Sequence, residues 1–172
     1  MQEALVLETR KKIIRELEKS IVKLENAIKK HINENSELKI QVSLLTTIPG
    51  VALITAATII GELGDIHRFS SAKKVAAFVG VSPRKYESGK SVKGKTRMCK
   101  EGQGRIRQTL YLSALAAIRV DNGLSRFYQR LVFNGKSKMA AIGAVMRKMI
   151  CIIRRLIIDK SFYKDKLVMP ST

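Results

Sequence analysis

The sequence has no tryptophan and only two cysteines, two histidines and three prolines among its 172 residues. Cys99 and Cys151 are far apart and form no CxxC pair, and two histidines cannot complete the ligand set of a zinc site. We therefore expect reduced, intracellular thiols and no zinc. Aromatic residues make up 5% of the chain and hydrophobic residues 45%, which predicts a folded protein with an aliphatic, helical core.

Acidic residues are scarce as well, since 14 Asp and Glu face 33 Lys and Arg, for a formal net charge of +19. Such a charge repels itself unless a polyanion neutralises it, so nucleic acid is the leading partner class and an anionic membrane surface the second. The N-terminus lacks the apolar segment of a secretory signal. The uncharged run 40–61 could span a bilayer, but Pro49 and Gly50 interrupt it, and two shorter buried helices explain it better.

The first 45 residues have the pattern of a coiled-coil helix. Apolar residues recur in steps of three and four, with two polar positions in the seam, His31 and Asn35, that are expected to fix register or partner number. An isolated helix cannot bury such a stripe, so it must pair with another helix, in a second copy of the chain or in a segment outside this sequence. The seam consists of Ile14, Leu17, Ile21, Leu24, Ile28, Leu38, Val42 and Leu45.

Residues 46–158 are predicted to form a compact helical domain, and residues 159–172 a flexible tail without periodicity. Helices are expected over 72–79, capped by Ser70 or Ser71 and ended by Gly80, and over 104–120, 124–133 and 138–158. The last of these has a buried apolar stripe and a basic edge of Arg147, Lys148, Arg154 and Arg155. The fold class is therefore all-α, with a long N-terminal helix in front of a helical domain.

Residues 48–51, Ile-Pro-Gly-Val, resemble the turn of a helix-hairpin-helix, a module that presents backbone N–H groups to a DNA phosphate. Gly50 is the candidate contact residue. Ala52 stands where the module usually has a second glycine, so a plain buried helical hairpin is an equal alternative.

Residues 78–108 have no apolar periodicity and are predicted to form a long basic loop containing five glycines between residues 80 and 107. This density of positive charge, with glycines that allow close backbone approach, suits a phosphate backbone. Arg105 and Arg107 also lie in the first turn of the following helix, where cations oppose the helix dipole and an incoming anion would favour them. A solvated loop without chemistry is the alternative. The cations are Arg84, Lys85, Lys90, Lys93, Lys95, Arg97, Lys100, Arg105 and Arg107.

The order of several motifs resembles the C-terminal domain of the transposase family of insertion sequences 110, 116 and 902, over about residues 44–156. The motifs are I-P-G-V, R-F-S-S-A at 68–72, A-F-V-G-V-S-P at 77–83, Y-E-S-G-K-S at 86–91, G-Q-G-R-I-R-Q-T-L at 102–110 and N-G-K at 134–136. Their chain of spacings is more specific than any single motif. The preceding helix is similar to the coiled coil that joins this domain to the family's N-terminal domain.

The resemblance implies a serine nucleophile that attacks a DNA phosphodiester and holds the cut end covalently. This role falls on Ser88, with Ser82 and Ser91 as competing candidates, and neighbouring cations would stabilise the developing charge. The family's N-terminal ribonuclease-H-like domain is implied to bind divalent metal, expected to be Mg²⁺, and a structured guide RNA is implied to direct target choice. The implied location is the bacterial cytoplasm, at the nucleoid.

This sequence departs from the family because it contains no carboxylate cluster that could hold two metal ions, so no cofactor is expected in this chain. It therefore resembles the C-terminal part of a transposase, from a truncated or split gene, that binds element ends and target DNA and self-associates through its coiled coil. Two alternatives stay open. One is a non-catalytic DNA- or RNA-binding helical module, and the other is an assembly role for the heptad helix.

Overall fold

The computed structural model describes residues 2–84, 87–88, 92–93, 97–99 and 101–168. It divides into two units, residues 1–39 and residues 40–172. In sequence order the helices are α1 (Gln2–Glu34), α2 (Ser36–Thr46), α3 (Leu53–Leu63), α4 (Ala72–Val79), α5 (Gly104–Ala117), α6 (Gly123–Phe133) and α7 (Lys138–Asp159). Two short 3₁₀ helices are η1 (Ile66–Arg68) and η2 (Asp165–Val168). The prediction of an all-α fold is confirmed.

Strand structure in the described residues is limited to two-residue pairs between α4 and α5. β1 (Pro83–Arg84) pairs antiparallel with β4 (Arg97–Met98), and β2 (Glu87–Ser88) pairs antiparallel with β3 (Val92–Lys93). The long basic loop predicted from the sequence therefore contains two short antiparallel strand pairs, which the sequence pattern did not indicate.

The predicted helix over residues 3–45 is interrupted at Asn35. The Asn35 side chain accepts a hydrogen bond from the Leu38 N–H (3.0 Å), and its carbonyl accepts one from the Lys39 N–H (2.9 Å). Asparagine is among the best N-cap residues because its side chain satisfies a free donor of the first turn. Asn35 therefore starts α2, and the expectation that it lies in a continuous seam is wrong.

Helix α1 is amphipathic and exposes its apolar stripe within the single chain. Leu17, Ile21, Leu24 and Ile28 are 58%, 55%, 65% and 37% exposed. Val42 and Leu45, which the heptad pattern placed in the same seam, are instead buried in the compact unit that begins at Ile40. The candidate seam for self-association therefore belongs to α1.

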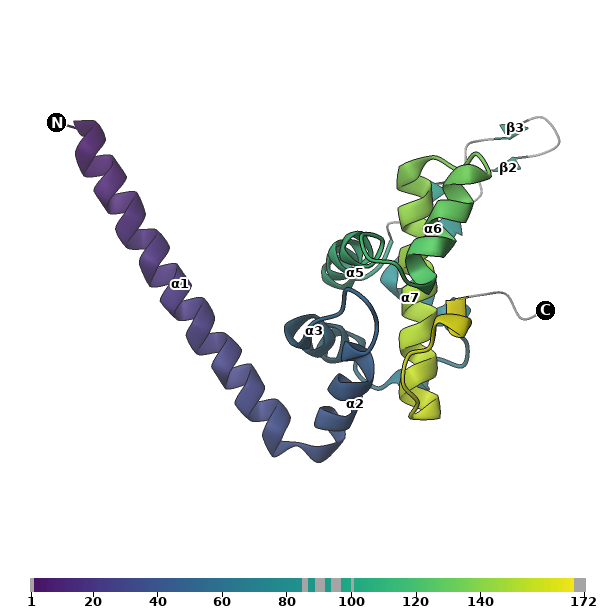
Figure 1. Cartoon of the computed structure of the whole chain (residues 1–172), viewed down its shortest axis with the longest axis horizontal. Coiled ribbons are helices and arrows are strands. Elements are labelled where there is room, and N and C mark those ends of the chain that lie inside the picture. The colour runs from purple at the N-terminus through teal and green to yellow at the C-terminus, as the bar shows by residue number, and fades with distance from the viewer. Residues whose placement is uncertain (1, 85–86, 89–91, 94–96, 100, 169–172) are drawn as a thin grey trace. The chain divides into compact units, whose positions relative to one another are not determined.

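Helix α7 is the central element of the compact unit. Helices α4, α5 and α6 all pack on it, and α6 lies along its flank in Figure 1. Three helices can pack on α7 because apolar side chains recur along it at spacings of three and four and cover most of its circumference. Within the described residues, no helix is both long enough and apolar enough to cross a membrane. The uncharged run 40–61 is split between α2 and α3, as the sequence predicts.

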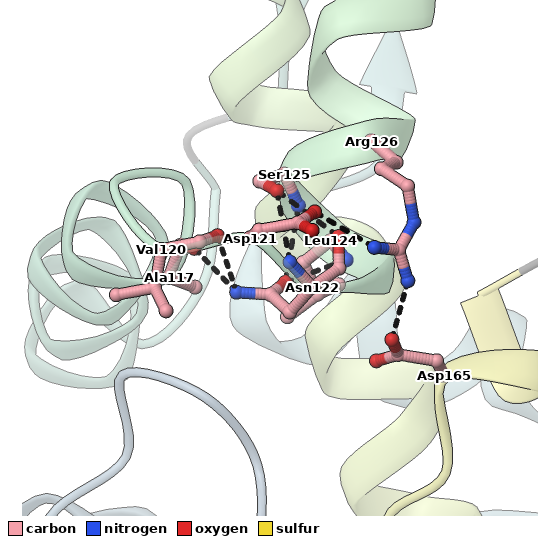
Figure 2. A network of polar contacts seen from close by, with 8 residues as sticks. All are labelled: Ala117, Val120, Asp121, Asn122, Leu124, Ser125, Arg126 and Asp165. Atoms are coloured by element: carbon pink, nitrogen blue, oxygen red, sulfur yellow. Dashed lines mark hydrogen bonds and ion pairs between the residues drawn. The ribbon is translucent and has the colours of Figure 1, made fainter.

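The break between α5 and α6 is fixed by Asn122, which is only 6% exposed. Its side-chain oxygen accepts from the N–H groups of Leu124 (2.8 Å) and Ser125 (3.1 Å), and its amide nitrogen donates to the carbonyls of Ala117 (2.8 Å) and Val120 (2.9 Å), as Figure 2 shows. One side chain thus caps the end of α5 and the start of α6.

The C-terminal segment, predicted to be a flexible tail, packs on the compact unit as far as Val168, which is 2% exposed. The Tyr163 N–H donates to the Thr47 hydroxyl (3.0 Å), and Arg126 on α6 donates to both Asp121 (2.7 Å) and Asp165 (2.5 Å; Figure 2). The segment is therefore anchored to Thr47, directly after α2, and to α6. Residues 169–172 lie outside the described residues.

The Asp165 anchor predicts a pH-dependent stability. The hydrogen bond from the Gly123 N–H, with a further contribution from Arg126, holds the pKa of the Asp165 carboxyl below its usual range. Because the folded-state pKa is depressed, the stabilisation is present above the ordinary carboxyl pKa of about 4 and is lost as the pH falls below it. Asp165 is partly exposed, so Asp165→Asn is expected to lower Tm at pH 7 by roughly 1–2 °C.

Thermal unfolding followed by circular dichroism at several pH values measures this effect. The gap in Tm between wild type and Asp165→Asn should close as the pH falls below about 4. Asp121→Asn is the comparison, because Asp121 binds the same arginine with a side chain that is 85% exposed, against 43% for Asp165. A gap that is undiminished at pH 3 would contradict the assigned role of Asp165.

Candidate nucleic-acid interface

The hairpin between α4 and α5 carries the serine that the sequence singles out. Ser88 lies on β2 with Val92 as its Cα partner on β3, so residues 89–91 connect the two strands. Ser91, Lys85, Lys90, Lys95 and Lys100 lie outside the described residues. The third candidate serine, Ser82, is half-buried before β1, and its carbonyl accepts a hydrogen bond from the Cys99 N–H (2.8 Å).

The register of the hairpin places Arg84 directly opposite Arg97. On the other pair of strands, Glu87 has Lys93 as its Cα partner.

The hairpin is attached through a close approach of residues 78–82 to residues 99 and 101–103, which we call the neck. The Gln103 N–H donates to the Phe78 carbonyl (3.1 Å). Gly80 has φ +77°, and a Cβ built there would lie 2.8 Å from the Cys99 carbonyl oxygen and 2.9 Å from that of Glu101. Gly102 has φ +147°, and a Cβ there would overlap the Phe78 carbonyl oxygen and lie 2.8 Å from the Gly80 nitrogen. Only glycine permits this approach, which fixes where the hairpin leaves the helices.

Arg107, on α5, contacts the neck from its C-terminal side. Its guanidinium donates to the Val79 carbonyl (3.1 Å) near the C-terminal end of α4, where a cation is favoured by the helix dipole. This contact explains the arginine in the first turn of α5 without an external anion. Arg105, in the same turn, pairs with Glu62 (3.0 Å), but its side chain is 75% exposed and is open to a further partner.

Met98 joins the base of the hairpin to α7. A Cβ on Gly143 would lie 2.7 Å from the Met98 terminal methyl carbon, so the glycine leaves the space that the methionine fills. Sequence reasoning missed this contact. The available signal was an isolated glycine within a strongly periodic helix, which commonly marks close packing.

Gly50 occupies the third position of a β-turn in which the Val51 N–H donates to the Ile48 carbonyl (3.0 Å). Its φ of +81° suits a turn with proline before it. A Cβ at Gly50 would overlap the Ser113 carbonyl oxygen and lie 2.9 Å from the Ala117 nitrogen, both on α5. The glycine is thus explained by packing of the turn against α5.

No group of three or more His, Cys, Asp or Glu side chains that could hold a metal ion occurs among the described residues. The described side chains therefore do not fit a two-metal nuclease centre. The three close backbone approaches at Gly50, Gly80 and Gly102 fix the turn and the base of the hairpin in a chain of formal net charge +19.

Residues 42–129, about half of the chain, match the family described as Transposase IS116/IS110/IS902. The chain belongs to this transposase family. The matched region includes the turn at Gly50, the neck and the whole hairpin, and it ends within α6.

The chain is also similar to several curated proteins. It is 34% identical over 140 residues to the pilin gene-inverting protein of Moraxella lacunata, an alignment that covers 81% of this chain and 44% of that protein. It is 28% identical over 141 residues to the insertion element IS110 43.6 kDa protein of Streptomyces coelicolor, an alignment that covers 82% of this chain and 35% of that protein. It is 25% identical over 155 residues to a probable family 20 transposase of Pseudomonas aeruginosa, an alignment that covers 86% of this chain and 43% of that protein. The chain therefore spans less than half the length of these relatives.

Proposed function

We propose that this chain is the serine-bearing, DNA-binding part of a transposase and takes part in DNA transposition or recombination. The observation that carries the proposal is the placement of Ser88 on a hairpin whose base opposes Arg84 and Arg97 and whose neck is held by Gly80 and Gly102. Membership of the transposase family supports DNA as the partner of this surface.

The proposed reaction is a phosphoryl transfer. The Ser88 hydroxyl oxygen attacks the phosphorus of a DNA phosphodiester, a new Oγ–P bond forms, and the bond from phosphorus to one sugar oxygen breaks. The proton lost by the serine hydroxyl balances the proton gained by the leaving sugar oxygen. Arg84 and Arg97 are the proposed stabilisers of charge on the phosphoryl oxygens in the transition state.

The remaining cations of the hairpin are proposed to position the DNA strand through its phosphates, because such contacts are sequence-independent. They are Lys85, Lys90, Lys93, Lys95 and Lys100. Exposed Arg105 is proposed to join them, while the contacts of Gly50 and Arg107 with the protein's own backbone account for those two residues.

Three further partners are proposals of the same kind. A metal-binding nuclease domain would be supplied by another polypeptide segment, since no carboxylate cluster is present in the described residues. A structured guide RNA would select the target. A second copy of the chain would cover the exposed apolar stripe of α1.

Peptide mapping of a covalent protein–DNA adduct tests the proposed function. The chain is incubated with nicked duplexes carrying element-end sequences, with Mg²⁺, and with or without the N-terminal part of a full-length relative. Nuclease digestion followed by mass spectrometry is expected to find the nucleotide remnant on Ser88. Attachment at Ser82 or Ser91 would overturn the assignment. DNA or RNA binding without any adduct would leave the non-catalytic module as the function.

Self-association through α1 gives a prediction with a closely matched control. Ile21 and Val22 are adjacent, both β-branched and almost equally exposed, at 55% and 56%, yet only Ile21 lies in the heptad seam. Ile21→Asp is expected to weaken self-association by about 100-fold, because it places a charge in a buried interface, whereas Val22→Asp should leave it nearly unchanged. Sedimentation equilibrium measures both, and equal effects of the two variants would argue against this seam.

A further inference from the structure

The half-buried side of α7 carries the basic residues of the helix. Buried residues cover most of the helix circumference, while the side chains of Ala144, Arg147, Lys148, Cys151, Arg154 and Ile158 are all half-buried and recur at spacings of three and four. This spacing places them on a single face of the helix. We call Arg147, Lys148, Arg154 and Arg155 on this face the α7 cationic face.

The α7 cationic face has little compensation from the protein's own acidic groups, because α7 has no acidic residue before Asp159. Arg154 donates to the Phe69 carbonyl (3.0 Å) and Arg155 pairs with Asp159 (3.2 Å). Among the described residues, neither Arg147 nor Lys148 has an ion-pair or hydrogen-bond partner. Two cations are therefore held side by side at the surface without a counter-charge.

The half-buried Cys151 thiol lies at the centre of this face, where the neighbouring positive charges influence its pKa. Burial raises the pKa of the thiol, while the positive charges of Arg147, Lys148 and Arg154 act to lower it. Two adjacent cations before Cys151 and one after it thus act on the same thiol. A converging positive potential of this kind attracts anions.

The position of the face relative to the hairpin suggests what the anion is. Met98, at the base of the hairpin, packs at Gly143, one helical turn before Arg147. From Arg147 to Arg155 the face extends for about 12 Å, which matches about three successive phosphates along one strand of a duplex. A DNA backbone that contacts the hairpin could therefore continue along α7.

We infer that the α7 cationic face binds the phosphate backbone of duplex DNA, as a second contact surface beside the hairpin. The inference rests on the proposed function in requiring DNA as the partner, but it does not require Ser88 to react. The face lies beyond the region that matches the transposase family, which ends at residue 129.

The salt dependence of duplex binding by the full chain tests the inference. The double variant Arg147→Gln/Lys148→Gln is expected to weaken binding by about tenfold and to reduce the slope of log affinity against log salt by about 2. Lys160→Gln/Lys164→Gln makes the same change in net charge on exposed residues after α7 and should alter the slope less. Circular dichroism should show that both double variants remain folded.

Alkylation of Cys151 gives a second, independent measurement. In a Cys99→Ser background, duplex DNA is expected to slow maleimide labelling of Cys151 several-fold in the wild-type face but not in the Arg147→Gln/Lys148→Gln variant. Protection by structured RNA or by anionic vesicles, but not by duplex DNA, would overturn the choice of partner.

The outcome for the hairpin separates this inference from the proposed function. If Lys93→Gln/Arg97→Gln lowers the salt slope while Arg147→Gln/Lys148→Gln does not, the second surface is refuted and the proposed DNA-binding function stands. If neither variant changes the slope, both are refuted.

Discussion

Replacing Ser88 with alanine is expected to reduce formation of the covalent protein–DNA adduct by more than about 10³-fold, because the variant has no oxygen to attack the phosphorus. DNA affinity should stay within about twofold of wild type, since phosphate contacts by the surrounding cations supply most of the binding free energy. A gel assay with a nicked, labelled duplex measures adduct formation, and fluorescence anisotropy measures affinity on the same preparations.

Ser82→Ala and Ser91→Ala are the matched controls for Ser88→Ala, because each removes one hydroxyl from the same segment. Ser82 contributes its backbone carbonyl, not its hydroxyl, to the hydrogen bond with the Cys99 N–H, so Ser82→Ala leaves that contact in place. Both controls should form the adduct. Normal adduct formation by Ser88→Ala, or loss of DNA binding in all three variants, would contradict the assignment of Ser88 as the nucleophile.

Helices of the compact unit could be predicted from the sequence because their signals are local. α4 begins after Ser71, whose side chain accepts from the Lys74 N–H (3.3 Å), and ends at Gly80 with φ +77°. Both positions follow from the capping preferences of serine and glycine. The apolar spacing of α7 likewise predicts its buried side and its basic edge.

The strand pairs could not be predicted from the sequence because each strand has only two residues, too few for a periodic signal. Pro83 faces Met98, and neither strand shows the alternation of apolar and polar residues that identifies a half-buried strand. The neck depends on backbone approach at Gly80 and Gly102, where the sequence shows glycines but not what they touch. The spacing of motifs in the sequence indicated which residues to consider for the candidate site. The backbone contacts of Gly80 and Gly102 could be seen only in the folded chain.

The interruption of the N-terminal helix at Asn35 shows how a local signal can be overruled by another. The apolar repeat continues from α1 into α2, so periodicity alone predicts one helix. The Asn35 side chain also fits an N-cap, and its bond to the Leu38 N–H favours a new helix start. Packing of Val42 and Leu45 in the compact unit favours the same arrangement.

Gly50→Ala is expected to destabilise the compact unit by about 4 kcal/mol or more, a large part of the 5–15 kcal/mol typical of a folded domain. Two effects combine. An alanine with φ near +81° is strained, and its Cβ would overlap the Ser113 carbonyl oxygen on α5, which is rigid helix backbone. Urea unfolding followed by circular dichroism measures the loss as a lower midpoint concentration.

Gly135→Ala separates strain from packing, because Gly135 has φ +83° but no atom within 4 Å of an added Cβ. It should cost only about 1–2 kcal/mol, the penalty for a left-handed alanine. The difference between the two variants then reports the contact of the turn with α5. If Gly50→Ala is no more destabilising than Gly135→Ala but selectively lowers DNA affinity, then Gly50 serves a phosphate contact, as in a helix-hairpin-helix, and its packing against α5 is secondary. Equal DNA affinity of the folded fractions of both variants would assign Gly50 to the fold.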